Sequence, residues 1–255
     1  MKVLAVIGAR KNGNTSHTAQ ELCRKIQAVG KAEINYLHLH DYELKYCLGC
    51  RVCFDKGETA CPHQDDLQAI VDKMKEADGL IFASPAFLND VSGIMKSFID
   101  RTAYFSHRPA FFTKCAFIVT TTHATGNKHT RNTMAGAVFS MGFYYAGSLN
   151  LKIPTVKKTP DFTKDKTKIN KSAKKFYKTI AEQKYRSPSL ISLVTFKMKQ
   201  KTWGAEDKKG SLDHLYWKEN GFLDPKRNYY IDVKVGLFKK TIIVLMKRLF
   251  FVIFG

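Results

Sequence analysis

Four of the six cysteines of this 255-residue chain crowd one short segment. Cys47, Cys50 and Cys53 are each separated by two residues, and Cys61, which precedes a proline, follows after a wider gap. Three closely spaced thiolates with a more distant fourth form a ligand pattern typical of Fe–S clusters, and one bacterial ferredoxin run also ends in Cys-Pro. Four thiolates also suit structural zinc, or they could stay free. The spacing favours a 4Fe-4S cluster, with zinc and a metal-free site as alternatives.

A second segment, from Gly8 to Thr15, has the composition of a phosphate loop. Its glycines allow tight turns, and its backbone N–H groups, its polar side chains and the following helix N-terminus could all point at an anion. It lacks the Gly-Lys-Ser/Thr ending of a Walker A loop and the glycine spacing of a G-x-G-x-x-G fingerprint. Two more polar segments, 84–89 and 120–126, follow later strands, so all three should open onto one crevice.

The elements that position these segments alternate along the chain. Apolar runs predict strands at 2–7, 32–37, 79–83, 115–121 and 144–151. Helical spacing of apolar residues predicts a helix after each of the first four strands, and a lysine-rich helix around 169–180 closes the series. This alternation indicates a parallel sheet with helices on both faces. The cysteines lie in the unusually long loop 46–62, which indicates a functional loop.

The chain is predicted to divide at about residue 186 into an α/β domain, 1–186, and a basic extension, 187–255. The extension ends in an amphipathic segment, 235–254, whose apolar face would pack on this subunit, on a partner subunit or on an anionic membrane; subunit packing is favoured. The net charge of +20 would suit nucleic acid, an anionic membrane or an anionic small molecule. Nucleic acid is disfavoured, because Phe176 and Tyr177 should pack on the core instead of stacking on bases. No apolar stretch reaches the roughly 20 residues of a membrane span, so we expect a cytoplasmic protein.

The chain from about residue 1 to residue 186 resembles the NADPH-dependent FMN reductase-like branch of the flavodoxin-like superfamily. That branch has a loop of the type Gly-Ser-x-Arg-Lys-x-Gly-Asn-Thr, which is one residue shorter here and has Ala9 without the serine. Ser84-Pro-Ala-Phe87 and Lys96-Ser-Phe-Ile-Asp-Arg101 match two further motifs of the family. The cysteine motif resembles that of the iron–sulfur flavoproteins of the same superfamily.

The resemblance implies a flavodoxin-like, doubly wound, five-stranded parallel sheet of order 2-1-3-4-5, with FMN bound by the three loops. Asp100 and Arg101 are expected to form a structural pair at a helix end, and no side chain is expected to act as a catalytic acid or base. The expected FMN-binding residues are Arg10, Lys11, Gly13, Asn14, Thr15, Ser84, Pro85, Ala86, Phe87, Leu88, Asn89, Thr121, Thr122, Ala124 and Gly126, and the expected metal ligands are Cys47, Cys50, Cys53 and Cys61.

These features predict an oxidoreductase in which FMN takes electrons from NAD(P)H or an Fe–S donor and passes them to a small molecule or protein. One alternative is an iron–sulfur flavoprotein fed by a ferredoxin-type donor without nicotinamide turnover. Another is a non-enzymatic flavodoxin-like module that docks on membrane or nucleic acid. By analogy with the family we expect a homodimer.

Overall fold

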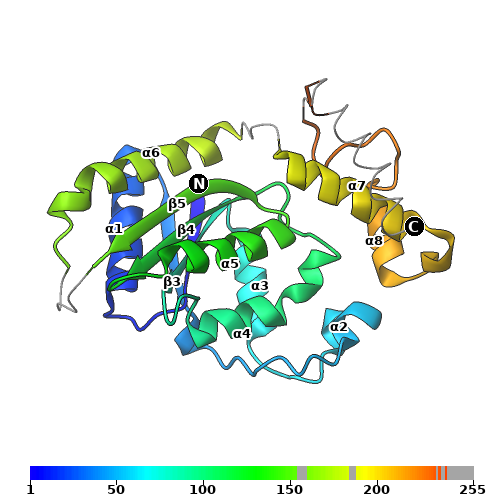
Figure 1. Ribbon diagram of the computed structural model, residues 1–255, viewed down its shortest axis with the longest axis horizontal. Coiled ribbons are helices and arrows are strands. Elements are labelled where there is room, and N and C mark those ends of the chain that lie inside the picture. The colour runs from blue at the N-terminus through cyan, green and yellow to red at the C-terminus, as the bar shows by residue number, and fades with distance from the viewer. Residues whose placement is uncertain (154–159, 184–187, 234, 237–238, 240–255) are drawn as a thin grey trace.

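The computed structural model describes residues 1–153, 160–183, 188–233, 235–236 and 239 (Figure 1). Five parallel strands form one sheet of order β2-β1-β3-β4-β5, which confirms the predicted flavodoxin-like architecture. The strands are β1 (Lys2–Ile7), β2 (Glu33–His38), β3 (Gly79–Pro85), β4 (Cys115–Thr122) and β5 (Tyr144–Lys152). The α-helices are α1 (Asn14–Val29), α2 (Val52–Asp55), α3 (Leu67–Glu76), α4 (Gly93–Arg101), α5 (Asn127–Ser140), α6 (Lys166–Glu182), α7 (Leu190–Gly204) and α8 (Leu212–Glu219). Short 3-10 turns cover Leu39–Asp41, Glu58–Ala60, Ala103–Ser106, Thr163–Asp165 and Glu206–Lys208.

One face of the sheet is covered by α1 and α6, which lie side by side (Figure 1). The two helices approach closely at Gly30, where an added Cβ would meet the Tyr177 hydroxyl oxygen at 2.2 Å. At Gly79, the first residue of β3, an added Cβ would lie 2.5 Å from Ile180 Cδ1. The lysine-rich helix α6 is therefore an integral layer of the domain, with its apolar stripe against the sheet and its lysines in solvent.

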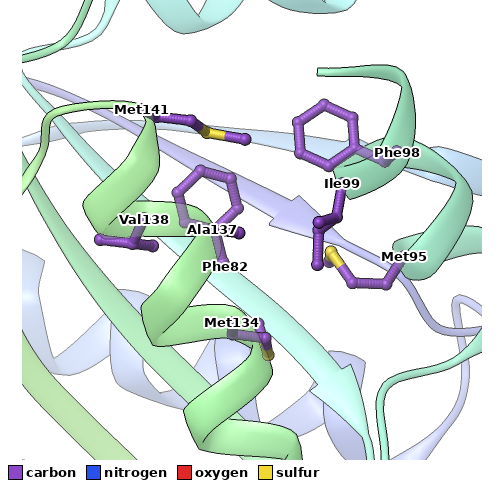
Figure 2. Close-up of a pocket in the computed structure, with 8 residues that line it drawn as sticks. All are labelled: Phe82, Met95, Phe98, Ile99, Met134, Ala137, Val138 and Met141. Carbon is purple, nitrogen blue, oxygen red and sulfur yellow. The ribbon is translucent and has the colours of Figure 1, made fainter. Parts of the chain in front are cut away.

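The other face is covered by α3, α4 and α5, and aromatic rings from Phe82, Phe98, Phe111 and Phe143 fill the space between the layers. Between α4 and α5 a small void of about 10 Å³ remains (Figure 2). Phe82 from β3 and methionines from both helices line it. A site this small and apolar is at the lower limit for holding one water molecule, so it is a packing gap and not a ligand pocket.

The described residues of the extension beyond residue 187 include two α-helices, α7 and α8, which lie beyond one end of the layered domain (Figure 1). Four buried aromatic side chains hold them together: Phe196, Trp217, Phe222 and Tyr230. Phe112, in the loop that leads into β4, stacks on this group with ring centroids 5.3 Å from Phe222 and 5.9 Å from Tyr230. The Tyr216 hydroxyl donates to the carbonyl of Pro109 in the same loop. The extension thus has a small aromatic core, to which Phe112 of the loop before β4 also contributes.

Two predictions, the amphipathic segment 235–254 and the lack of a membrane span, can be compared with the described residues. The amphipathic segment 235–254 falls almost entirely on residues 240–255, outside the described part of the chain. Of the helices that the structure describes, none has both the length and the apolar character needed to cross a bilayer. The domain boundary at residue 186 and the role of the final segment stay predictions.

The packing of α6 generates a stability prediction. Phe176 is fully buried on the inner face of this helix and lies against Phe117 of β4, with ring centroids 5.5 Å apart. We expect Phe176→Ala to lower the free energy of unfolding by about 3–5 kcal/mol, because it removes a large buried side chain and leaves a cavity. Urea unfolding followed by circular dichroism measures the change. Lys174→Ala, on the exposed side of the same helix, should change stability by less than about 0.5 kcal/mol, and equal losses for the two variants would contradict the layer arrangement.

Candidate functional site

The three polar segments predicted to face one crevice meet at the carboxyl edge of the sheet. The Ser92 hydroxyl, which caps α4, donates to the Gly8 carbonyl at 2.6 Å, and the Ser92 N–H donates to the Ser84 hydroxyl at 3.0 Å. The hydroxyls of Thr15 and Thr121 are 2.6 Å apart, which joins the start of α1 to the end of β4. These bonds connect the ends of β1, β3 and β4 into one platform.

The first loop has the features of an anion site. Helix α1 begins at Asn14, after Gly13 as its N-cap residue; no side chain of the described chain caps its first turn, which also lacks acidic residues. Its positive dipole end is therefore directed at the loop. The Ser16 hydroxyl donates to the Arg10 carbonyl at 2.7 Å and fixes the loop, while Arg10 and Lys11 are exposed. Lys11 forms an ion pair of 2.9 Å with Asp41, which keeps its charge beside the loop.

The second loop makes a tight, strained turn at the end of β3. The N–H and C=O groups of Phe87 and Asp90 exchange hydrogen bonds of 2.8 and 3.0 Å. The two residues between them, Leu88 and Asn89, both have positive φ, of 46° and 68°, as a type I′ turn requires. A leucine with positive φ is strained. Leu88 is also fully exposed, and Phe87 is 62% exposed. Backbone strain together with exposed apolar groups is typical of a ligand-binding loop.

The third loop packs directly on the second. The Ala86 N–H donates to the Thr121 carbonyl at 2.8 Å. Gly126 precedes α5 with a φ of 97°, and an added Cβ there would lie 3.1 Å from both Cα and Oδ1 of Asn89. Glycine is required at this position for the conformation and for the close approach.

The structure divides the predicted FMN-binding residues into two groups. Several line the platform from inside: Ser84, Thr121 and Thr122 are buried, and their hydroxyls bond within the protein. Gly13 and Thr15 are buried as well. The others reach the surface: Pro85, Ala86, Asn14 and Gly126 are half-buried, and Arg10, Lys11, Phe87, Leu88, Asn89 and Ala124 are exposed. All fifteen belong to the three converging loops, and their contact with FMN stays a prediction.

All four predicted metal ligands line one cavity of about 370 Å³. Cys47 and Cys50 are exposed and Cys53 and Cys61 are half-buried, all as free thiols. Burial raises the pKa of the Cys53 thiol, and the neighbouring charges of Cys47, Cys61 and Cys50 raise it further. Among the described residues, no three histidine, cysteine or acidic side chains are already drawn together closely enough to hold a metal ion. The donor set fits a metal centre, and binding requires the sulfurs to move towards one another.

The other two cysteines are structural, as expected. Cys23 on α1 and Cys115 at the start of β4 are fully buried in the core under α1 and α6. Burial raises the pKa of each thiol to about 12. Neither forms a thiolate near neutral pH.

A buried ion pair lies beside the cysteine cavity. Arg101, at the end of α4, binds the Asp65 carboxylate at 2.5 and 3.1 Å and donates to the Lys45 carbonyl at 2.9 Å. Its guanidinium also lies 3.7 Å from Cys61 Sγ. The expected pairing of Asp100 with Arg101 is wrong, because Asp100 faces solvent and pairs with Lys96 at 2.6 Å. Arg101 turns inward because Asp65 supplies the buried countercharge.

The cysteine segment is a loop whose two ends meet. The Asp66 N–H donates to the Glu43 carbonyl at 3.1 Å, and the Glu43 N–H donates to the Asp66 carboxylate at 2.7 Å. The chain between them projects from the domain and includes α2 (Figure 1). The loop lies against the C-terminal end of α4, whereas the three polar loops meet at its N-terminal end. Nine helical residues span about 13 Å, so one helix separates the two sites within the chain.

Comparison with known proteins identifies this arrangement. The sequence profile described as NADPH-dependent FMN reductase matches residues 1–156. The chain belongs to this family. An iron-sulfur flavoprotein of Clostridioides difficile (strain 630) is 32% identical over 222 residues, covering 84% of this chain and 96% of that protein. An iron-sulfur flavoprotein of Methanocaldococcus jannaschii is 40% identical over 103 residues, which is 40% of this chain and about half (52%) of that protein.

Solved structures of similar fold support the architecture. A flavone reductase superposes with a TM-score of 0.57 at 14% identity, covering 73% of this chain and 66% of that one. An NADH:FMN oxidoreductase in its apo form gives 0.53 at 18% identity, covering 70% and 89%. RosB gives 0.50 at 16% identity and covers 93% of this chain and 92% of its own, a superposition that extends past β5 and α6. The solved structures show the fold, and the family match together with the clostridial relative makes the chain a flavin-dependent oxidoreductase of the FMN reductase and iron–sulfur flavoprotein family.

Several residues that build the site escaped the sequence analysis. Ser92 had a local signal, because a serine directly before a helix is a common N-cap. No local signal marks the pairing of Asp65 with Arg101, because it joins residues 36 positions apart. Nothing in the local pattern at Arg108 or Asp213 indicates the buried pair that they form.

The Asp65–Arg101 pair makes a pH-dependent contribution to stability. Burial opposes ionisation of Asp65, but hydrogen bonds from Arg101 and from the backbone of Lys45 and Leu67 outweigh it and lower the pKa of this carboxyl. Its stabilising effect is therefore complete above the ordinary aspartate pKa of about 3.9 and is lost as the pH falls through the lower folded value.

We expect Asp65→Asn to cost about 3–5 kcal/mol of unfolding free energy at pH 7, because it leaves the Arg101 charge buried without a countercharge. Urea unfolding at a series of pH values should show the gap to the wild type narrowing below about pH 4. Asp100→Asn, which removes an exposed partner in α4, should cost less than about 1 kcal/mol. A gap that stays constant down to pH 2 would contradict the role of the Asp65 charge.

Proposed function

We propose that this protein is an FMN-dependent oxidoreductase that passes electrons between NAD(P)H or an Fe–S donor and a small-molecule or protein acceptor. The observation that carries the proposal is the meeting of three loops at the carboxyl edge of the sheet, where α/β proteins of this topology bind cofactors. Family membership supports the choice of flavin over other nucleotides.

The residues present fit FMN. The uncapped N-terminus of α1, Arg10 and Lys11 would hold the phosphate. The strained turn at Phe87–Asp90 and the loop at Ala124–Gly126 would enclose the ring, because they form adjacent walls that approach as closely as glycine permits. FMN would supply hydride or single-electron transfer, and the protein would orient it and stabilise its reduced, more negative form with backbone N–H groups and positive charge.

The cysteine cavity supports a second redox centre in the same chain. Cys47, Cys50, Cys53 and Cys61 would ligate a 4Fe-4S cluster, since thiolates are the ligands of such clusters and all four open onto one cavity. The names of the similar clostridial and archaeal proteins agree with this choice. Structural zinc is the alternative for the same four thiolates.

The cysteine cavity also favours a second candidate function. An iron–sulfur flavoprotein that receives single electrons from a ferredoxin-type protein would need no nicotinamide turnover. The two candidates differ in the rate at which NAD(P)H reduces the flavin under anaerobic conditions. In both cases we propose a homodimer, with subunit packing favoured over an anionic membrane as the partner of segment 235–254.

The deciding experiment is an anaerobic visible spectrum of the purified protein, with iron, zinc and acid-labile sulfide measured on the same sample. We expect flavin bands together with stoichiometric iron and sulfide. Cys50→Ser should lose iron and sulfide and keep FMN, whereas Cys115→Ser, which alters a buried core thiol, should keep both. Flavin bands without metal would indicate a plain FMN reductase. Stoichiometric zinc without iron and sulfide would indicate a structural zinc site in place of the cluster. The absence of flavin bands after addition of FMN would refute the proposal.

Gly126 provides a separate test of the flavin site. We expect Gly126→Ala to weaken FMN binding roughly tenfold, because a Cβ at positive φ costs about 1–2 kcal/mol and would press on Asn89. Titration of the apoprotein with FMN, followed by quenching of flavin fluorescence, gives the dissociation constant. Gly136→Ala, in open space on α5, should leave that constant unchanged, and a normal constant for Gly126→Ala would place the flavin elsewhere.

A further inference from the structure

A buried charge network joins the C-terminal helices to the cysteine loop. Asp213, in the first turn of α8, is only 6% exposed. One of its carboxylate oxygens accepts a hydrogen bond from Arg108, and the other lies 2.8 Å from Nδ1 of His107. Arg108, itself buried, donates to the carbonyl of Cys53 at 2.6 Å and lies 3.2 Å from a carboxylate oxygen of Glu58. The network thus runs from α8 through Arg108 to the backbone of a predicted metal ligand.

Aromatic and apolar contacts follow the same path. The His107 ring lies between Phe54 of the cysteine loop and Trp203 of α7, with centroid distances of 4.4 and 4.8 Å. The indole N–H of Trp217 donates to the His107 carbonyl at 2.9 Å, which ties α8 to the same residue. At Gly57 an added Cβ would lie 3.7 Å from the Leu212 side chain. The cysteine loop is therefore held from one side by α7 and α8.

The contacts act on the part of the loop where the backbone is least regular. Arg51 has a φ of 63°, Gly57 has a φ of 94°, and the four-residue helix α2 lies between them and carries Cys53. So short a helix has little stability of its own. A buried guanidinium bound to the Cys53 carbonyl, and neutralised by Asp213, fixes this helix relative to the domain.

We infer that Asp213 and Arg108 are positioning residues for the four-cysteine site, through which the C-terminal helices hold Cys53 in place for metal binding. The bonds of Arg108 with Asp213, Glu58 and the Cys53 carbonyl form a clamp. The inference rests on the proposed metal site, and it gives residues 190–219 a function that the flavin platform does not require. Residues that hold metal ligands in position, without contacting the metal themselves, commonly affect metal affinity when they are mutated.

The first test needs no metal. Hydrogen–deuterium exchange of the metal-free protein compares the wild type with Asp213→Asn and with the control Asp207→Asn, whose exposed carboxylate pairs only with the adjacent Lys208 among the ion pairs of the described chain. We expect faster exchange over residues 52–60 in Asp213→Asn alone, with the strands of the sheet unchanged. Equal exchange over 52–60 in all three proteins would overturn the inference.

The second test measures the site itself. Anaerobic titration with Co²⁺, followed by thiolate-to-cobalt absorption, should show roughly 10- to 100-fold weaker binding by Asp213→Asn. Asp213→Glu keeps the carboxylate and should recover part of the affinity, and FMN binding should match the wild type in both variants. Equal cobalt affinity in wild type and Asp213→Asn would refute the clamp. Failure of the wild type to bind cobalt would count against the proposed metal site, and the exchange experiment would still decide the clamp.

Discussion

The constraint on which this structure depends is the parallel direction of its strands. Every strand delivers its carboxyl end to the same edge of the sheet, so the loops after β1, β3 and β4 must meet there. Their meeting still has to be fixed, and the bond from Ser92 to the Gly8 carbonyl does so at the point where three elements come together. The same hydroxyl accepts a hydrogen bond from the Met95 N–H and so caps α4, which means that one side chain sets both the start of the helix and the shape of the platform.

Helix α4 then transmits this placement to the second site. Its first turn belongs to the platform formed by the three loops, and its last residue, Arg101, lines the cysteine cavity and binds Asp65. Arg101 and Arg108 bring two positive charges into the interior on the side of the cysteine loop, and each is neutralised by a buried aspartate. Both guanidiniums also contact the cysteine segment itself, Arg101 at Cys61 Sγ and Arg108 at the Cys53 carbonyl.

The fold was largely predictable because its signals are local. Continuous apolar runs mark the buried strands, and the stripe of Ile169, Ala173, Phe176 and Ile180 marks α6 as a core helix despite its lysines. The loops and the cysteines were equally visible, since glycine, polar and thiol residues cluster in short segments. Pairings across long sequence separations were not predictable: Asp65 with Arg101, Asp213 with Arg108, and the aromatic core of α7 and α8 depend on how the chain folds back, and the local pattern carries no trace of it.

The closed base of the cysteine loop has a consequence for how such a chain can change over time. Since Glu43 and Asp66 bond to each other directly, the sheet and α3 already have their connection without the residues between them. An intervening segment can therefore lengthen, shorten or disappear at a cost that grows only slowly with its length. The four-cysteine loop is thus an insertion in the domain, and its loss would leave an ordinary flavodoxin-like crossover between β2 and α3.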